Sequence, residues 1–268
     1  MSTLLMERPL QLGHELQLEN VSQTFKGQNG QGTVTALLPT NIHVKPGEFV
    51  GLVGPSGCGK TTALNMIGGI VKPTHGRVLV GGKPAREGHP EVGYLMARDS
   101  LLPWRTAQAN VVLPLELKGV PKPEAQERAA DILKAVGLGS FLDAYPSQLS
   151  HGMRQRVAVA RTLVSNPGTI LMDEPFSALD AETRLKLQAE FLRLWDAHKS
   201  TVVFVTHDLA EAIIMCDRIL VFSARPGKIV ANFEIDLPRP RQVLELQGNA
   251  QYQELFREIW SIFRRELK

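Results

Sequence analysis

Gly-Pro-Ser-Gly-Cys-Gly-Lys-Thr-Thr, residues Gly54 to Thr62, follows the apolar run Phe49 to Val53 and precedes a predicted helix, Ala63 to Ile67. Its glycines allow the backbone to turn sharply and bring successive N–H groups against phosphate oxygens, and the helix N-terminus adds a positive dipole end. Lys60 can then reach the β- and γ-phosphates, and the Thr61 hydroxyl can ligate Mg²⁺. The motif therefore predicts a nucleotide-binding phosphate cradle, rather than an accidental glycine-rich turn. It is built from Gly54, Pro55, Ser56, Gly57, Cys58, Gly59, Lys60, Thr61 and Thr62.

The composition is that of an ordinary globular protein. The chain has 268 residues, of which 43% are hydrophobic and 21% charged, and its net charge is only +3. So small an excess of positive charge gives no argument for a nucleic acid or an anionic membrane surface, and no nucleic-acid partner is expected. The two cysteines, Cys58 and Cys216, form neither a disulfide framework nor a metal-ligand spacing, which fits a reducing compartment and two small buried thiols.

No segment of the sequence predicts secretion or a membrane span. Met1 to Gly13 carries Glu7, Arg8 and Pro9 where a secretory signal needs an unbroken apolar core. No later stretch approaches the roughly 18 consecutive apolar residues of a spanning helix. We therefore expect a flexible N-terminus over residues 1–15 and a cytoplasmic protein that does not cross a membrane alone.

Strands are predicted on both sides of the cradle. Alternating residues predict a strand over Leu16 to Thr24, a loop over Lys26 to Gly32, a strand pair over Thr33 to Val44 and a short strand over Arg77 to Val80. Strands before and after the cradle indicate a mixed sheet.

Two later apolar runs predict buried parallel strands. Thr169 to Asp173 and Thr201 to Thr206 flank a predicted helix, Glu182 to His198. This strand, helix and strand form a parallel βαβ unit, and the loops at the strand C-terminal ends should carry the site. A helix over Leu209 to Cys216 and a strand over Ile219 to Phe222 follow.

The region between the cradle and these strands is predicted to be helical. Glu124 to Val136 has apolar residues at helical spacing, and Ser150 stands as an N-cap before Met153 to Val164. Near the C-terminus an apolar stripe at helical spacing predicts an amphipathic helix that packs on the core rather than on a membrane. The stripe consists of Tyr252, Leu255, Phe256, Ile259, Ile262 and Phe263.

Acidic residues end the first of the buried strands. An acid at the strand tip, here Asp173, can hold Mg²⁺ through water, and the next acid, Glu174, can orient or deprotonate an attacking water. Leu149 to Met153 offers the Ser150 hydroxyl and Gly152 at a helix N-terminus, a second anion-binding arrangement. One nucleotide rarely needs two such cradles.

Five segments together resemble the ATPase subunit of ABC transporters over the chain from about Leu16 to its end. They are Gly54 to Thr62, Leu149 to Arg156, Ile170 to Pro175, Ser177 to Asp180 and Thr206 to Asp208. Three further segments look like the branch that serves nitrate, sulfonate and taurine importers: Leu101 to Arg105, Phe222 to Gly227 and Asp236 to Arg241.

The resemblance implies a role for each site residue. Phe25, which otherwise could be a core aromatic, would stack on adenine, Lys60 would contact the β/γ oxygens, and Thr61 and Asp173 would serve Mg²⁺. Glu174 would be the general base and His207 the sensor of the γ-phosphate. In this family two chains hold two ATP molecules head to tail, so Ser150 and Gly152 would contact the γ-phosphate bound in the other subunit. Asp180 would lie at the same interface.

The sequence departs from the family pattern at two positions. Ala97 stands where a glutamine usually ends the strand that leads to the transporter-facing loop, and alanine can touch neither Mg²⁺ nor the attacking water. Arg98 or Asp99 could substitute for that glutamine. The second departure is His151, where glycine is common. We expect hydrolysis to persist and coupling to the transporter to be altered.

The expected architecture is a single ABC ATPase domain over residues 16–268, with an α/β P-loop NTPase (RecA-like) core. The resemblance implies an antiparallel β subdomain and an inserted α-helical subdomain. Residues 16–100 and 165–240 would form the nucleotide-binding core with the β subdomain, 101–164 the helical subdomain, and 241–268 a C-terminal amphipathic helix.

The expected function is hydrolysis of ATP to drive import of a small, anionic or sulfonated solute. The chain would act at the cytoplasmic face of the membrane. Its direct partners would be a second ATPase subunit and membrane permease subunits, which Leu101 to Val120 would contact. A solute-binding protein would be an indirect partner. Two alternatives are a soluble ABC ATPase acting as a clamp on DNA, which needs a long heptad insert before Ser150, and a P-loop small-molecule kinase.

Overall fold

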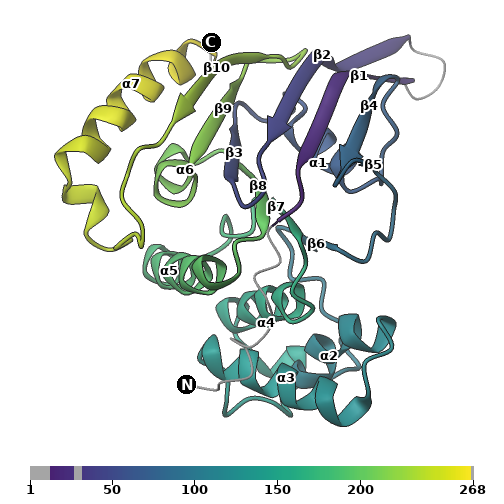
Figure 1. The fold of residues 1–268 in the computed structure, drawn as a ribbon. Helices are drawn as coiled ribbons and strands as arrows, with labels where there is room; N and C mark the ends of the chain where they lie inside the picture. Colours follow the sequence, from purple (N-terminus) through teal and green to yellow (C-terminus); the bar gives the residue numbers. More distant parts are fainter. Residues whose placement is uncertain (1–12, 27–31, 267–268) are drawn as a thin grey trace.

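The strands form two separate sheets in the computed structural model, which describes residues 13–26 and 32–266. Most of the expected flexible terminus, and nearly all of the predicted loop after Lys26, lie outside the described residues. Figure 1 shows three helices gathered at one end of the molecule, away from the sheet that begins with the N-terminal strands. These helices are α2 (Ala107–Leu117), α3 (Lys122–Ala135) and α4 (His151–Leu163).

A six-stranded sheet forms the centre of the molecule, in the order β10-β9-β3-β8-β7-β6. All neighbouring strands are parallel except β9 and β10, which are antiparallel. The inner strands β3, β7 and β8 are almost completely buried, because helices cover one face of the sheet and a helix together with strands of the second sheet covers the other; this explains their continuous apolar runs. The strands are β3 (Phe49–Val53), β6 (Val92–Leu95), β7 (Thr169–Asp173), β8 (Thr201–Thr206), β9 (Arg218–Phe222) and β10 (Ile229–Glu234).

The register of this sheet brings three loops to one edge. Val53 pairs with Thr206, and Asp173 pairs with Val205, so β3, β7 and β8 end at nearly the same level. Helix α5 (Ala181–His198) connects β7 to β8 as predicted, and α1 (Lys60–Ile67) and α6 (Leu209–Met215) follow β3 and β8. The parallel topology therefore places the phosphate motif, the acidic pair and the His207 loop side by side.

The second sheet is antiparallel and has the order β2-β1-β4-β5. The predicted mixed sheet is the central one, but the strands before the cradle do not join it: they form the antiparallel β subdomain that the resemblance implied, in which β1 pairs on one edge with β2 and on the other with β4. Both edges of β1 are satisfied in this way, which leaves it no edge for β3. The predicted strand pair over Thr33 to Val44 is a single strand. The strands are β1 (Leu16–Lys26), β2 (Thr33–Val44), β4 (His75–Val80) and β5 (Lys83–Pro84).

The helical region has a hydrophobic cluster of its own. Val111, Ala129 and Leu133 are fully buried in it, and Val157 of α4 joins them. Helix α2 was not predicted as a separate element, because Pro114 lies inside it and interrupts the helical signal. Helices α2 and α3 have 11 and 14 residues, so the described part of this region contains no long heptad helix of the kind a DNA clamp requires.

Aromatic side chains fill the core on the α5 side of the central sheet. The Phe49 ring packs edge-on against Trp195, with 5.3 Å between ring centroids, and also contacts Phe191 and Phe204. These rings fix α5 against β3 and β8, because edge-to-face packing is favourable and all four side chains are buried.

The C-terminal helix α7 (Ala250–Glu266) packs against α6. Its predicted apolar stripe does pack on the core, since Tyr252, Ile259 and Phe263 are buried. Within the described residues, none of the helices combines the length and the apolar character needed to cross a bilayer. The remaining short elements are the 3₁₀ turns η3 (Pro146–Gln148) and η4 (Leu246–Gly248).

Candidate active site

The predicted phosphate cradle lies between β3 and α1, at the carboxyl edge of the central sheet. Helix α1 begins at Lys60, inside the motif and earlier than predicted, with Gly59 as its N-cap at φ 95°. A Cβ on Gly59 would lie 2.8 Å from the Ala36 carbonyl oxygen, and Gly57 also has a positive φ of 76°. The loop can therefore keep this shape only with glycine at both positions. Cys58, within the loop, is buried, as is Cys216.

Lys60 is a buried cation held by neutral groups. Its side-chain amine donates to the carbonyl oxygens of Gly54 at 2.8 Å and Pro55 at 2.9 Å, and only 5% of the residue is exposed. Among the described residues no carboxylate forms an ion pair with it. A buried charge is stable only when it is compensated, so a polyphosphate is a suitable counter-ion for this site.

Thr61 and Asp173 meet across the edge of the sheet. The Thr61 hydroxyl donates to Asp173 Oδ1 at 3.0 Å, which joins the cradle to the tip of β7. Burial raises the pKa of the Asp173 carboxyl, although the Thr61 hydrogen bond lowers it. A hydroxyl and a carboxylate side by side are hard oxygen donors, and Mg²⁺ prefers one or two such groups together with phosphate oxygens. These two residues therefore fit the predicted magnesium site.

Glu174 and His207 form the next pair along the same edge. His207 Nδ1 and Glu174 Oε2 are 3.0 Å apart, and both side chains remain partly exposed. Glu174 has a φ of 47°, which is uncommon for a residue with a side chain, and its backbone N–H donates to the Val205 carbonyl at 2.9 Å. Such a backbone is kept only where the surroundings enforce it, and it often marks a functional position. The carboxylate is thus fixed at the edge by backbone and imidazole together.

Ser150, Gly152 and Asp180 lie together in a second place. They line one open depression with Thr183, and no residue of the cradle lines it. Ser150 caps α4 by accepting from the Met153 N–H at 3.3 Å, and Asp180 caps α5 by accepting from the Thr183 N–H at 3.0 Å. That hydrogen bond lowers the pKa of Asp180.

The N-termini of α4 and α5 approach each other closely at this depression. A Cβ on Gly152 would lie 2.9 Å from Thr183 Cγ2, so a larger residue would push the two helix ends apart. Two positive dipole ends side by side favour an anion there. The structure thus separates the predicted residues into a cradle with its acids and a second anion-binding surface.

Phe25 lies near the end of β1 and is not a core residue. It is 41% exposed, which excludes the alternative that it packs in the interior. Its contact with adenine stays a prediction.

The segment around Ala97 is held by α4. Asp99 Oδ2 accepts from Arg154 Nε at 2.9 Å, and Arg161 donates to the backbone carbonyls of Asp99 and Ser100. The suggestion that Asp99 substitutes for the missing glutamine is weakened, because its carboxylate is already engaged. Arg98 is exposed.

Sequence reasoning missed a polar cluster behind His207. Arg184 and Gln188 of α5 reach Asp208 and the buried Glu211 of α6. Burial raises the pKa of Glu211 to about 7. The sequence signal was weak, because Arg184 and Glu211 look like ordinary polar residues on the first turns of their helices.

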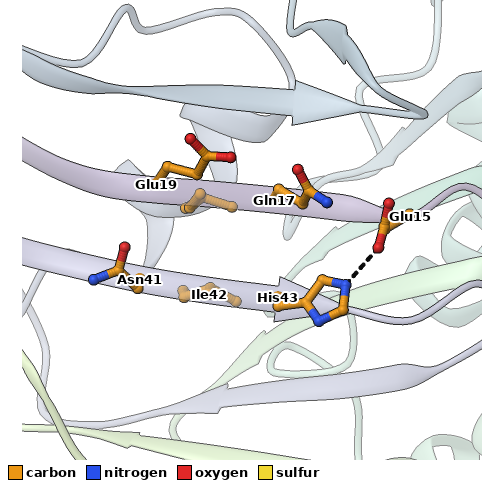
Figure 2. A pocket seen from close by; sticks show the side chains of 7 residues that line it. Glu15, Gln17, Glu19, Asn41, Ile42 and His43 are labelled. Carbon is orange, nitrogen blue, oxygen red and sulfur yellow. Dashed lines mark hydrogen bonds and ion pairs between the residues drawn. The ribbon is translucent and has the colours of Figure 1, made fainter.

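A further depression lies on the antiparallel sheet, away from these residues. Figure 2 shows side chains of β1 and β2 side by side, with Glu15 paired to His43 at 2.6 Å. That hydrogen bond is the main reason why the pKa of Glu15 is lowered. None of the predicted site residues lines this surface.

The parallel sheet, the cradle and the acidic pair at its carboxyl edge define a P-loop nucleotide-binding protein. Residues 37–177 match the family model described as ABC transporter. An uncharacterized ABC transporter ATP-binding protein of Methanocaldococcus jannaschii, MJ0412, is 46% identical over 253 residues, which are 94% of this chain and 92% of that protein. The taurine import ATP-binding protein TauB of Rhizobium johnstonii is 39% identical over 251 residues, 92% and 95% of the two chains.

A solved structure has the same fold. It is a dimeric post-hydrolysis state of the ATP-binding cassette MJ0796 bound to ADP and Pi, with a TM-score of 0.74 and 35% identity, covering 83% of this chain and all of that one. The chain therefore belongs to the ABC transporter family, as an ATP-binding protein with the ABC ATPase fold. Its activity is that of an ATPase, and its relatives include the importer branch that the sequence resembles.

Proposed function

We propose that this chain is the ATP-hydrolysing subunit of an importer for a small anionic or sulfonated solute, and that it works as a head-to-tail dimer at the cytoplasmic face of a membrane. The observation that carries the proposal is the Glu174 to His207 pair at 3.0 Å, directly beside the Thr61 to Asp173 pair at 3.0 Å. A general base with its orienting histidine, and a pair of oxygen ligands suited to Mg²⁺, thus lie next to a phosphate cradle.

The chemistry is in-line attack of water on the γ-phosphorus of ATP. The water oxygen bonds to phosphorus, the bond to the β,γ-bridging oxygen breaks, and ADP leaves with that oxygen. Glu174 Oε accepts a proton from the water, and His207 keeps the carboxylate in place by its hydrogen bond. Lys60 and the cradle N–H groups hold the phosphates. Mg²⁺, when bound at Thr61 and Asp173, supplies charge neutralisation.

The second anion-binding surface supports the dimer. Ser150, Gly152 and Asp180 share a depression with no cradle residue, and Ser150 and Asp180 are exposed. In a head-to-tail arrangement this surface would face the γ-phosphate held by the other chain. The dimeric state of the MJ0796 cassette, with which this chain shares its fold, supports a dimer here as well.

The solute class and the membrane partners rest on relatives and on sequence segments. TauB is a taurine import protein, and taurine is a sulfonate. Leu101 to Val120, which includes the exposed Trp104 and Leu117, is the proposed surface for a permease subunit. The test uses the solute-binding protein that serves the same transporter and measures its melting temperature with nitrate, taurine, other sulfonates and aromatic carboxylates. Its true ligand should be among these anions and should stabilise it. If none of these anions raises its melting temperature, the proposed solute class is wrong.

Glu174→Gln tests the catalytic proposal. Loss of a general base should slow steady-state turnover by about 10²-fold or more, while the variant still binds ATP and accumulates as a dimer in light scattering. Glu15→Gln is a matched control, because Glu15 also pairs with a histidine but lies on the antiparallel sheet. Unchanged turnover in Glu174→Gln, or a monomer at saturating ATP, contradicts the proposal.

A further inference from the structure

Arg184, near the start of α5, contacts two segments that are separate in the sequence. Its Nη2 donates to the Leu179 carbonyl at 3.0 Å, and its Nη1 donates to Asp208 Oδ2 at 3.3 Å. Its Nε lies 3.7 Å from Glu211 Oε1 and has no hydrogen bond within the described part of the chain. The side chain is 28% exposed, so this guanidinium is mostly enclosed by its partners.

The first of these segments is the turn Ser177 to Asp180. This turn is tied to the general-base residue, because the backbone N–H and the hydroxyl of Ser177 both donate to the Glu174 carbonyl, at 3.2 and 2.9 Å. The turn ends at Asp180, whose side chain is exposed in the depression of the second anion-binding surface. Arg184 thus holds the turn from behind through the Leu179 carbonyl.

The second segment is the loop that carries His207. Asp208 follows His207 directly, and its other carboxylate oxygen caps α6 by accepting from the backbone N–H of Ala210 at 2.8 Å. Thr206, which precedes His207, donates from its hydroxyl to Glu211 Oε2 at 2.8 Å. His207 is therefore exposed between two residues that are both fixed by the cluster around Arg184.

These contacts close a circuit around the site. From Glu174 it runs through Ser177 and Leu179 to Arg184, then through Asp208 to His207, whose imidazole returns to the Glu174 carboxylate. Within this circuit Arg184 joins the turn to the histidine loop on the side opposite Glu174, which contacts both through Ser177 and His207. A planar guanidinium can reach several acceptors in fixed directions, which the single ammonium of lysine cannot reproduce.

We propose that Arg184 is a positioning residue for hydrolysis: it fixes the Ser177 to Asp180 turn and the His207 loop relative to each other, and so sets where the Glu174 carboxylate lies. A shift of the turn would then reach His207 through Arg184. The inference rests on the proposed roles of Glu174 and His207, and it adds a residue that contacts neither the cradle nor the Thr61 to Asp173 pair.

A purely structural role for Arg184 would give a different result. An anchor of the α5 N-terminus would change folding stability alone and leave the properties of the folded enzyme intact. A positioning residue should instead lower kcat while KM for ATP stays close to its original value, because misplacement of a reacting group by about 1 Å can cost 10²-fold in rate.

The experiment compares Arg184→Met and Arg184→Lys in the purified full-length protein. We expect kcat to fall by about tenfold or more in Arg184→Met, with KM for ATP within about twofold, and incomplete rescue by Arg184→Lys. Arg193→Met is the matched control, since Arg193 is on the same helix but is exposed and donates to the Ala135 carbonyl, outside the circuit. Circular dichroism reports whether each variant is folded.

A double substitution tests the route of the effect. The losses in kcat are compared as free energies of activation. If Arg184 acts through Asp208, the loss in the double variant should be clearly smaller than the sum of the losses in Arg184→Met and Asp208→Asn. Additive losses, kcat within about twofold of the unsubstituted protein in folded Arg184→Met, or full rescue by lysine would overturn the inference.

Glu174→Gln is measured in the same series, so that the two proposals fail separately. If it abolishes turnover and folded Arg184→Met does not lower kcat, only the role of Arg184 is wrong. If Glu174→Gln turns over normally, the proposed roles in the site are wrong, and the inference falls with them.

Discussion

Gln155 of α4 donates a hydrogen bond from Nε2 to the Pro175 carbonyl oxygen at 2.7 Å, in a fully enclosed position. The bond joins the helix that Ser150 caps to the residue directly after Glu174. The second anion-binding surface and the general-base residue of one chain are thus connected through a single buried amide.

Gln155→Ala should destabilise the protein. The substitution leaves the buried Pro175 carbonyl without its donor and opens a cavity, which together cost about 1–3 kcal/mol or somewhat more. For a chain of this size the thermal midpoint should fall by about 2–4 °C per kcal/mol. Gln108→Ala is the control, because Gln108 also donates to a carbonyl, that of Gln126, but at the surface. Equal midpoints for the two variants would contradict the argument.

Lys60→Met should remove stabilisation by ATP. ATP at about 100 times its Kd stabilises the folded protein by about 2.7 kcal/mol, or roughly 5–10 °C in thermal midpoint. Lys60 is the buried cation of the cradle, so its loss should abolish most of this shift. Lys72→Met, an exposed lysine after α1, should keep it. A full ATP-dependent shift in Lys60→Met would refute the assignment of Lys60 to the phosphates.

Glu211 should make stability depend on pH. Its pKa is about 7 in the folded protein because burial disfavours the charge, against 4.5 for an ordinary glutamate. A proton therefore binds more tightly to the folded than to the unfolded state. The associated stability is fully present below about pH 4.5 and is lost as the pH rises through about 7.

The measurement compares the protein with Glu211→Gln in urea unfolding at several pH values. The stability of the unsubstituted protein relative to the variant should fall by an amount on the order of 3 kcal/mol between about pH 4.5 and 8, since each unit of pKa shift corresponds to about 1.4 kcal/mol. Other titrating groups cancel in this difference. A difference that does not change with pH would show that Glu211 does not titrate in this range.

Ala97→Gln tests whether the missing glutamine alters coupling. Asp99 is engaged by Arg154 and cannot readily take over, so we expect hydrolysis to persist and its stimulation by the loaded solute-binding protein to rise in the variant. The ATPase rate of the assembled transporter is measured with and without that protein. Equal basal rates and equal stimulation for the unsubstituted and the Ala97→Gln transporters would contradict the prediction that Ala97 alters coupling.

The local motifs and the inner strands could be predicted from the sequence, because short-range chemistry determines them. The glycines at 57 and 59 impose the backbone of the cradle, and continuous apolar runs are typical of strands covered on both faces, such as Thr169–Asp173 and Thr201–Thr206. The Ser150 N-cap follows from side-chain chemistry alone. The position of Glu174 directly after the acid at a strand tip indicated its role, whereas the role of His207 came from family resemblance.

Only the tertiary structure decided how these segments meet. The split into two sheets depends on which strand edges β1 satisfies, and hydrogen bonds between strands far apart in the sequence leave no local signal. The same holds for Arg184, which looks like a solvated helix residue until the parallel sheet brings β7 and β8 to a common edge. Individual residue types set the chemistry of the site, whereas strand pairing and burial set its geometry.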